Sequence, residues 1–171
     1  MLREDITIRP ATKRDLPAVG RLGAELVRLH HRFDPDRFLA PEGDLEQGYA
    51  WFLGTRIGKR GVVLIVAERE GEILGYAYGE MEPLSWKELR DAAGFVHDVV
   101  VDEGVRRRGI ATRLVEETVR RLEDLGAPRV LLWTAAKNAE ADRLFERLGF
   151  RRTMIERTRE RGHKPGAESA S

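Results

Sequence analysis

The sequence has 171 residues, of which 42% are hydrophobic and 35% are charged. A chain of this length and composition is expected to form one compact soluble domain, because it is too apolar to stay disordered over its main body. The formal net charge is +1, so no overall field draws the protein to nucleic acid or to a membrane surface. Cysteine is absent, which excludes disulfides, thiolate metal sites and a cysteine nucleophile.

The sequence shows neither a membrane span nor a signal peptide. No apolar run approaches the roughly 20 residues that a membrane span needs, and residues 1–5 lead into no apolar signal-peptide core. We therefore expect a cytoplasmic protein with one domain over residues 1–159. Residues 160–171 are rich in Gly, Pro, Ser and charge, and we expect them to form a flexible tail.

The first half of the chain predicts helices and strands with clear boundaries. A short alternating strand over 6–8 ends at Pro10. Thr12 and Asp15 have the spacing of a helix-opening capping pair, and leucines at helical spacing continue that helix to about His31. The elements expected next are a helix over 44–57, a hairpin of strands over 62–68 and 73–82, and a polar connection over 83–94 with one helical turn at 86–90.

The second half is more regular. The β-branched run 95–101 predicts a strand buried on both faces. A loop over 102–108 leads into a helix over 109–125, which Gly126 ends. The remaining predicted elements are a strand over 129–134, a helix over 138–148 and a final strand over 151–158.

The loop before helix 109–125 carries the strongest functional signal. Strand 95–101, this helix and strand 129–134 form a βαβ unit, which predicts parallel strands with a right-handed crossover. Ligands of open α/β sheets bind where such a strand ends and its helix begins. At that place the sequence has Arg106, Arg107, Arg108, Gly109, Ile110, Ala111 and Thr112.

The residue types of this loop suit an anionic ligand. Exposed amides in the first turn of a helix, together with the helix dipole, attract an anion. Gly109 and Ala111 keep side chains away, so phosphate oxygens can approach the backbone. The spacing matches neither a Walker loop nor Gly-x-Gly-x-x-Gly. We interpret the loop as a pyrophosphate cradle rather than as a solvated basic turn that only opens a helix.

At these residues the chain resembles the GNAT superfamily of N-acetyltransferases. The superfamily signature Arg/Gln-x-x-Gly-x-Gly/Ala is matched by Arg106, Gly109 and Ala111. The stretches 8–16, 99–102 and 138–150 also resemble the family, so that the resemblance covers about residues 6–158. It implies an α/β fold with a mixed, mostly antiparallel central sheet flanked by helices, whose parallel βαβ pair splays apart to admit the cofactor.

The resemblance also implies the ligands and their binding residues. Acetyl-CoA would be the cosubstrate, and the acceptor would be a primary amine of a small molecule, peptide or protein that attacks directly in a ternary complex. The backbone of Val99, Val100 and Val101 would pair with the pantetheine arm, and the amides over 107–112 would hold the pyrophosphate. Asn138 would contact the cofactor, although an asparagine that opens a helix is also a good N-cap. An amide of Val99 or Val100 would donate to the oxyanion.

Acyl transfer to an amine needs a base, and His97 is the first candidate. Histidine titrates near neutrality, and this position resembles the strand histidine of arylalkylamine N-acetyltransferases. Glu80, on the preceding strand, can reach an amine through water. Strand alternation predicts that Asp98 faces away from His97, and we interpret it as structural. Phe145 stands where many family members have a tyrosine acid, which leaves Tyr76, Tyr78, water or no acid at all for the leaving group.

The residues leave several alternatives open for the acceptor, the function and the oligomeric state. The acceptor is not identified, although an aromatic pocket floor meeting a cationic amine is the simplest hypothesis. Adjacent His30 and His31 cannot face one ligand, so no metal site is expected. The missing tyrosine favours a non-catalytic acyl-CoA sensor as the alternative function. Basic residues over 151–164 lack a nucleic-acid motif and are explained by a charged edge strand. The sequence leaves open a homodimer that forms through a sheet edge or the last strand.

Overall fold

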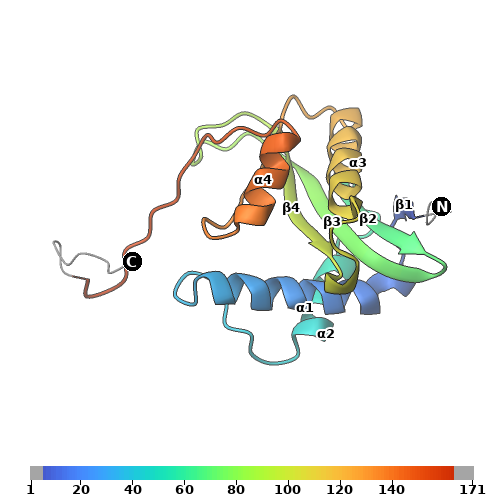
Figure 1. Ribbon diagram of the computed structural model, residues 1–171. Coiled ribbons are helices and arrows are strands. Elements are labelled where there is room, and N and C mark those ends of the chain that lie inside the picture. The colour runs from blue at the N-terminus through green and yellow to red at the C-terminus, as the bar shows by residue number, and fades with distance from the viewer. Residues whose placement is uncertain (1–5, 164–171) are drawn as a thin grey trace.

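The computed structural model describes residues 6–163, which form a five-stranded sheet with helices on both faces (Figure 1). The strands lie in the order β1-β2-β3-β4-β5; β1 to β4 are antiparallel neighbours, and β5 pairs parallel with β4. The strands are β1 (Thr7–Pro10), β2 (Val62–Arg69), β3 (Glu72–Glu82), β4 (Ala93–Val101) and β5 (Val130–Leu132). The α-helices are α1 (Leu16–Phe33), α2 (Leu45–Gly54), α3 (Ile110–Asp124) and α4 (Ala139–Arg147).

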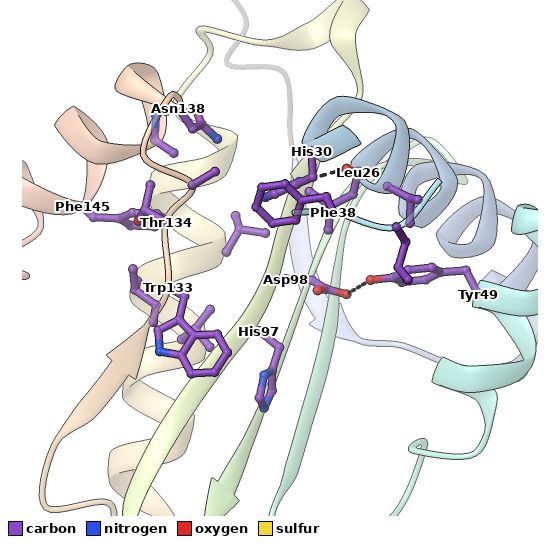
Figure 2. A pocket seen from close by; sticks show the side chains of 17 residues that line it. Leu26, His30, Phe38, Tyr49, His97, Asp98, Trp133, Thr134, Asn138 and Phe145 are labelled. Atoms are coloured by element: carbon purple, nitrogen blue, oxygen red, sulfur yellow. Dashed lines mark hydrogen bonds between the residues drawn. The ribbon is translucent and has the colours of Figure 1, made fainter. Parts of the chain in front are cut away.

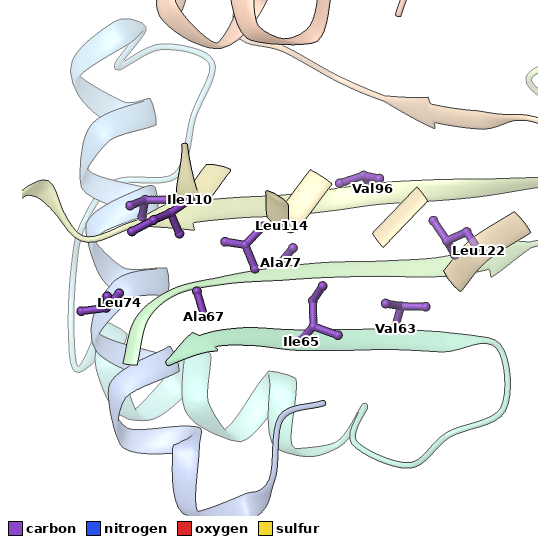
Figure 3. Packing of buried hydrophobic residues seen from close by; sticks show 10 residues of the cluster. Val63, Ile65, Ala67, Leu74, Ala77, Val96, Ile110, Leu114 and Leu122 are labelled. Atoms are coloured by element: carbon purple, nitrogen blue, oxygen red, sulfur yellow. The ribbon is translucent and has the colours of Figure 1, made fainter. Parts of the chain in front are cut away.

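Alternation along the central strands divides the core into two layers. Val63, Ile65 and Ala67 of β2 pack with α3, as Figure 3 shows from close by. Leu64 and Val66, between them in the sequence, pack with α1 and α2 on the opposite face. Because both faces are covered, most residues in the middle of the central strands are apolar.

Side-chain caps set the start of two helices, and the predicted capping pair before α1 is confirmed. The capping box formed by Thr12 and Asp15 is present before α1. The side chain of Asp44 accepts a hydrogen bond from the backbone N–H of Gln47 and caps α2. Such caps satisfy amides that have no acceptor within the helix, so they set where each helix begins.

Asp15 is also the centre of a polar cluster that joins α1 to the sheet. Two nitrogens of the Arg9 guanidinium donate to its carboxylate oxygens at 2.8 and 2.9 Å, and the backbone N–H of Thr12 donates at 2.7 Å. The hydrogen bonds from Arg9 outweigh burial and lower the pKa of Asp15 to about 2.

Most predicted elements are confirmed, including the hairpin of β2 and β3 and the parallel pair of β4 and β5. Two predictions are wrong. The turn over 86–90 is not helical; it is closed by backbone hydrogen bonds between Ser85 and Arg90 at 2.9 and 3.1 Å. The final strand over 151–158 does not form, because β5 has only three residues and the stretch lies away from it. Of the predicted tail, residues 164–171 lie outside the described residues.

We predict that Asp15 makes stability depend on acid pH. Its pKa in the folded state, about 2, lies below the ordinary 3.8, so its contribution to the free energy of unfolding is present above about pH 4. That contribution is lost as the pH falls from about 4 to 2, since the unfolded chain takes up the proton first. Urea unfolding of Asp15→Asn should show lower stability at pH 7 and a shallower acid slope than wild type. Asp36→Asn, at an exposed loop carboxylate, is the control; equal slopes for wild type and Asp15→Asn would contradict the prediction.

Candidate functional site

The central feature of the site is a β-bulge in β4. Tyr78 of β3 pairs with Asp98, but the next residue, Gly79, pairs with Val96, so His97 is an extra residue in the ladder. The bulge turns His97 and Asp98 to the same face, toward α1 and α2. The His97 ring stacks with the rings of Phe95 and Tyr78, with centroid distances of 4.8 and 5.1 Å. The prediction that Asp98 faces away from His97 is therefore wrong, because the inserted residue shifts the alternation.

Asp98 is held by two tyrosines under α2. The hydroxyl groups of Tyr49 and Tyr76 donate to the same carboxylate oxygen, Oδ2, at 2.7 and 3.0 Å. Figure 2 shows the hydrogen bond from Tyr49. Burial raises the pKa of Asp98, and burial next to Asp98 raises the pKa of both tyrosines. Since a buried carboxylate without partners is strongly unfavourable, these two hydrogen bonds lock Asp98, and with it the bulge, in one position.

A pocket of about 300 Å³ lies where β4 and β5 separate. The two strands pair only over Gly94–Val96 and Val130–Leu132, and beyond these residues β5 leaves the sheet. Figure 2 shows side chains from α1, β4, β5 and α4 converging on this opening. The lining includes Leu26, His30, Phe38, Tyr49, His97, Asp98, Val99, Trp133, Asn138 and Phe145.

Backbone N–H groups of β4 face this opening beyond the end of β5. The N–H of Asp102 donates to the Leu74 carbonyl on β3 at 2.8 Å. Successive residues of a strand direct their N–H groups to opposite sides, so the N–H of Val100, two residues before Asp102, also faces β3. Val99 and Val101 then direct their N–H groups toward the side from which β5 has diverged.

The basic loop lies at the carboxyl end of β4, as predicted. The side chain of Arg106 turns back to the strand, with Nε donating to the Val101 carbonyl at 3.3 Å. Gly109 has a φ of +76°, a left-handed conformation that favours glycine, and α3 begins at the next residue. The first-turn amides of Ile110, Ala111 and Thr112 have no acceptor within the helix, because the residues four positions before them lie outside α3. No residue of this loop lines the pocket, so Val99 to Val101 connect the two regions.

Two glutamates of β3, Glu80 and Glu82, lie near His97. Glu80 accepts hydrogen bonds from Tyr78 and Arg56. Burial alone would raise the pKa of Glu80, but these hydrogen bonds outweigh it and the pKa lies below its usual value. Nε2 of His97 lies 3.2 Å from Oε1 of Glu82. The structure therefore brings Glu82, rather than Glu80, into contact with His97.

Sequence reasoning missed two residues of the site. Glu82 lies on the same face of β3 as Tyr78 and Glu80, and the two-residue strand period could have found it. Trp133 carries no such signal: it follows the short β5, is 73% exposed and contacts Phe95 edge-to-face at 5.2 Å.

The other predicted site residues lie on α4. Asn138 caps this helix by accepting from the N–H of Ala141 at 3.2 Å, and it also lines the pocket. Phe145 lines the pocket and contacts Phe150 edge-to-face at 5.9 Å. Within residues 6–163 no group of three or more potential metal ligands occurs, and no helix there is long and apolar enough to cross a membrane.

We predict that Gly23 of α1 is required to seat Tyr49. A methyl group at Gly23 would lie 2.1 Å from Cδ1 of the Tyr49 ring, so Gly23→Ala must displace that ring from Asp98. Overpacking of this kind destabilises by about 1–3 kcal/mol, measurable by urea unfolding. Gly48→Ala in α2 is the matched control, because its added methyl meets nothing within 4 Å. If both variants were as stable as wild type, the proposed seating of Tyr49 would be wrong.

Known proteins resemble this chain in sequence and in fold. A sequence model described as the acetyltransferase (GNAT) family matches residues 24–150. A mycothiol acetyltransferase of Kocuria rhizophila is 31% identical over 159 residues, which cover 91% of this chain and 49% of that protein. A mycothiol acetyltransferase of Thermomonospora curvata is 32% identical over 93 residues, covering 54% of this chain and 29% of that one. The chain thus spans less than half the length of these relatives.

A solved structure shows the same fold. A predicted acetyltransferase from Clostridium acetobutylicum, crystallised with acetyl-CoA, superimposes with a TM-score of 0.69 at 14% sequence identity. The alignment covers 90% of this chain and 96% of that one. The predicted mixed sheet with a splayed parallel pair is confirmed by this likeness and by the strand pairing described above.

Proposed function

The chain belongs to the acetyltransferase (GNAT) family, and on that basis we propose that it transfers an acetyl group from acetyl-CoA to a primary amine. The amine, on a small molecule, peptide or protein, attacks the thioester directly while both substrates are bound. The observation that supports this proposal is the placement of the basic loop 106–112 and the separation of β4 and β5 at one end of the sheet. We also propose that the protein is cytoplasmic and that it forms a homodimer.

Acetyl-CoA would be bound largely by the backbone. The first-turn amides of α3 and the neighbouring loop suit the pyrophosphate, and Arg106, Arg107 and Arg108 add positive charge. The N–H of Val101 suits an amide carbonyl of pantetheine, which would lie beside β4 like an added strand. Asn138, at the pocket wall, adds a polar side chain beside the same path.

The acetyl carbonyl would then lie in the pocket beside the bulge. In this position the N–H of Val99 can donate to the oxyanion that develops during attack. Asp98, Tyr49 and Tyr76 fix the bulge one residue away. Fixed donors of this kind stabilise developing charge without reorganisation, which is where electrostatic catalysis gains most of its effect.

His97 is the proposed general base. Its side chain is 32% exposed and therefore accessible to an incoming ammonium group. After it accepts the proton, the nearby carboxylate of Glu82 stabilises the imidazolium. Glu80, ionised by its contacts with Tyr78 and Arg56, contributes negative charge that favours a cationic acceptor.

The leaving thiolate would take its proton from water. Phe145 carries no proton to donate, and the hydroxyls of Tyr49 and Tyr76 are already bound to Asp98. The hydroxyl of Tyr78 donates to Glu80, and burial raises the pKa of Tyr78. No tyrosine near the bulge is therefore free to act as the acid.

We predict that His97→Ala lowers kcat about 10²–10⁴-fold, the range typical of a general base. Initial rates with acetyl-CoA and a panel of amines would measure it, and calorimetry should find acetyl-CoA affinity unchanged. Glu82→Gln keeps the shape but removes the charge that stabilises the imidazolium, so its kcat should fall less. An unchanged kcat–pH profile in His97→Ala would remove His97 from the mechanism. Wild-type binding without turnover of any amine would favour the non-catalytic acyl-CoA sensor.

We also predict that Gly109 is needed for the cofactor. Gly109→Ala forces a side chain into a left-handed position, at a cost of about 1–2 kcal/mol, and should weaken acetyl-CoA binding, seen as a smaller rise in melting temperature on titration. Gly126→Ala is the matched control. Gly126 also has a positive φ (+95°) and also has open space around it, but it lies at the opposite end of α3. Equal acetyl-CoA affinity in the two variants would argue against the loop as the pyrophosphate site.

A further inference from the structure

Five rings contact one another in sequence across the sheet, and we name this set the aromatic row. Its members, from α2 to the residue after β5, are Phe52, Tyr78, His97, Phe95 and Trp133. His97 lies at the centre, stacked between Tyr78 and Phe95 at centroid distances of 5.1 and 4.8 Å. At the two ends, Phe52 packs edge-to-face with Tyr78 at 5.9 Å, and Trp133 packs edge-to-face with Phe95 at 5.2 Å. Because each ring contacts the next, the row fixes the position of the candidate base.

The middle of the aromatic row is buried, whereas its end at Trp133 is open. Tyr78 and Phe95 are 5% and 4% exposed, and Trp133 is 73% exposed. Trp133 also lines the pocket, and Figure 2 shows it toward the same end of the pocket as His97. An exposed indole beside an accessible imidazole gains strongly from being covered by an apolar molecule, because tryptophan buries a large area and prefers ring partners.

The aromatic row lies on the side of the bulge that the cofactor leaves free. Along β4, Phe95 and His97 precede Val99 to Val101, and the cofactor path proposed above runs from these valines to loop 106–112. The amine must therefore approach over the row. This step rests on the proposed acetyl transfer, since that reaction is what assigns the valines to the cofactor.

The carboxylates near His97 are already paired with basic side chains. Arg56 forms an ion pair with Glu80, and Arg90 forms one with Glu82. A second ammonium group on the acceptor would have to compete with a guanidinium for either carboxylate, and the like charges would repel it. The charges therefore suit an acceptor with one ammonium group.

The wall of the pocket on the side of α1 suits an apolar acceptor. Leu26 and Phe38 line it there. Two polar groups on this side are already engaged: Asp98 accepts from Tyr49 at 2.7 Å, and Nδ1 of His30 lies 2.9 Å from the Leu26 carbonyl. An acceptor rich in hydroxyl groups would lose hydrogen bonds to water that these groups cannot replace, and each such loss weakens binding.

We propose that the acceptor is a small primary amine with one positive charge and an aromatic ring, and that Trp133 is the specificity-determining residue that binds this ring. The ammonium group then faces His97. The amine nitrogen forms a bond to the acetyl carbon while the bond from that carbon to sulfur breaks. Overall the ammonium gives up two protons: the thiolate receives the equivalent of one through water, and His97 passes the other to solvent.

The first test compares acceptors at saturating acetyl-CoA. Initial rates should give phenethylamine a kcat/KM about 10-fold or more above that of ethylamine, the advantage typical of one hydrophobic contact, and cadaverine and glucosamine should be poorer than phenethylamine. Trp133→Ala should raise the KM for phenethylamine and remove most of its advantage, without changing the rates with ethylamine or the KM for acetyl-CoA. Trp86→Ala, at a tryptophan that is 83% exposed on the connection between β3 and β4, is the control and should change neither value. A preference for cadaverine or glucosamine, or unchanged selectivity in Trp133→Ala, would overturn the proposal.

The second test does not require turnover. The chain has three tryptophans, and the other two, Trp51 and Trp86, are 72% and 83% exposed, so the double variant Trp51→Phe/Trp86→Phe should fold and keep Trp133 as its only tryptophan. In the presence of CoA, phenethylamine should change the fluorescence of this variant saturably, and ethylamine should not. A saturable change without acetylation of any amine would refute acetyl transfer but support the acceptor surface. Acetylation of phenethylamine without a change at Trp133, or neither result, would refute the role of Trp133.

Discussion

The hydrogen bonds of Asp98 to Tyr49 and Tyr76 are the interaction on which the candidate site depends. They join the middle of β4 to α2 and to β3, and the side chains of Asp98 and Tyr76 are buried there. Because Asp98 follows the bulged residue directly, this network also determines where the extra residue of the strand goes. The exposed position of His97 and the direction of the Val99 N–H both follow from that one bulge.

The bulge and the short β5 together open the sheet. Up to Val96 the parallel pair is joined, and beyond it β4 continues alone to Val101 and the basic loop. A strand that has lost one neighbour presents backbone groups that need partners. In the proposed reaction these groups would meet an extended ligand with amide groups, and the helix dipole of α3 would meet its phosphates. Backbone geometry, more than side-chain identity, would then account for cofactor binding.

The same short β5 leaves the other side of the sheet incomplete. Its outer edge has no partner in the described chain, and residues 151–158 are held by contacts of Glu156 with Arg37 and of Arg152 with Asp142. The pocket wall formed by Trp133 and α4 is therefore the least supported part of the site.

The sequence by itself determined the elements whose signals are local. Hydrophobic periodicity located the helices and the central strands, and the side chains of Thr12, Asp44 and Asn138 marked helix starts. The βαβ pattern and the loop around Gly109 located the candidate cofactor site, because residue type and chain order are sufficient for such a motif.

Tertiary structure decided the features that depend on distant partners. The bulge at His97 requires a register between β3 and β4 that neither strand specifies alone, so alternation misplaced Asp98. The contact between His97 and Glu82 depends on that register too. Residues 151–158 have the composition of a strand, but a strand exists only where another strand pairs with it, and in the described part of the chain these residues pair with none.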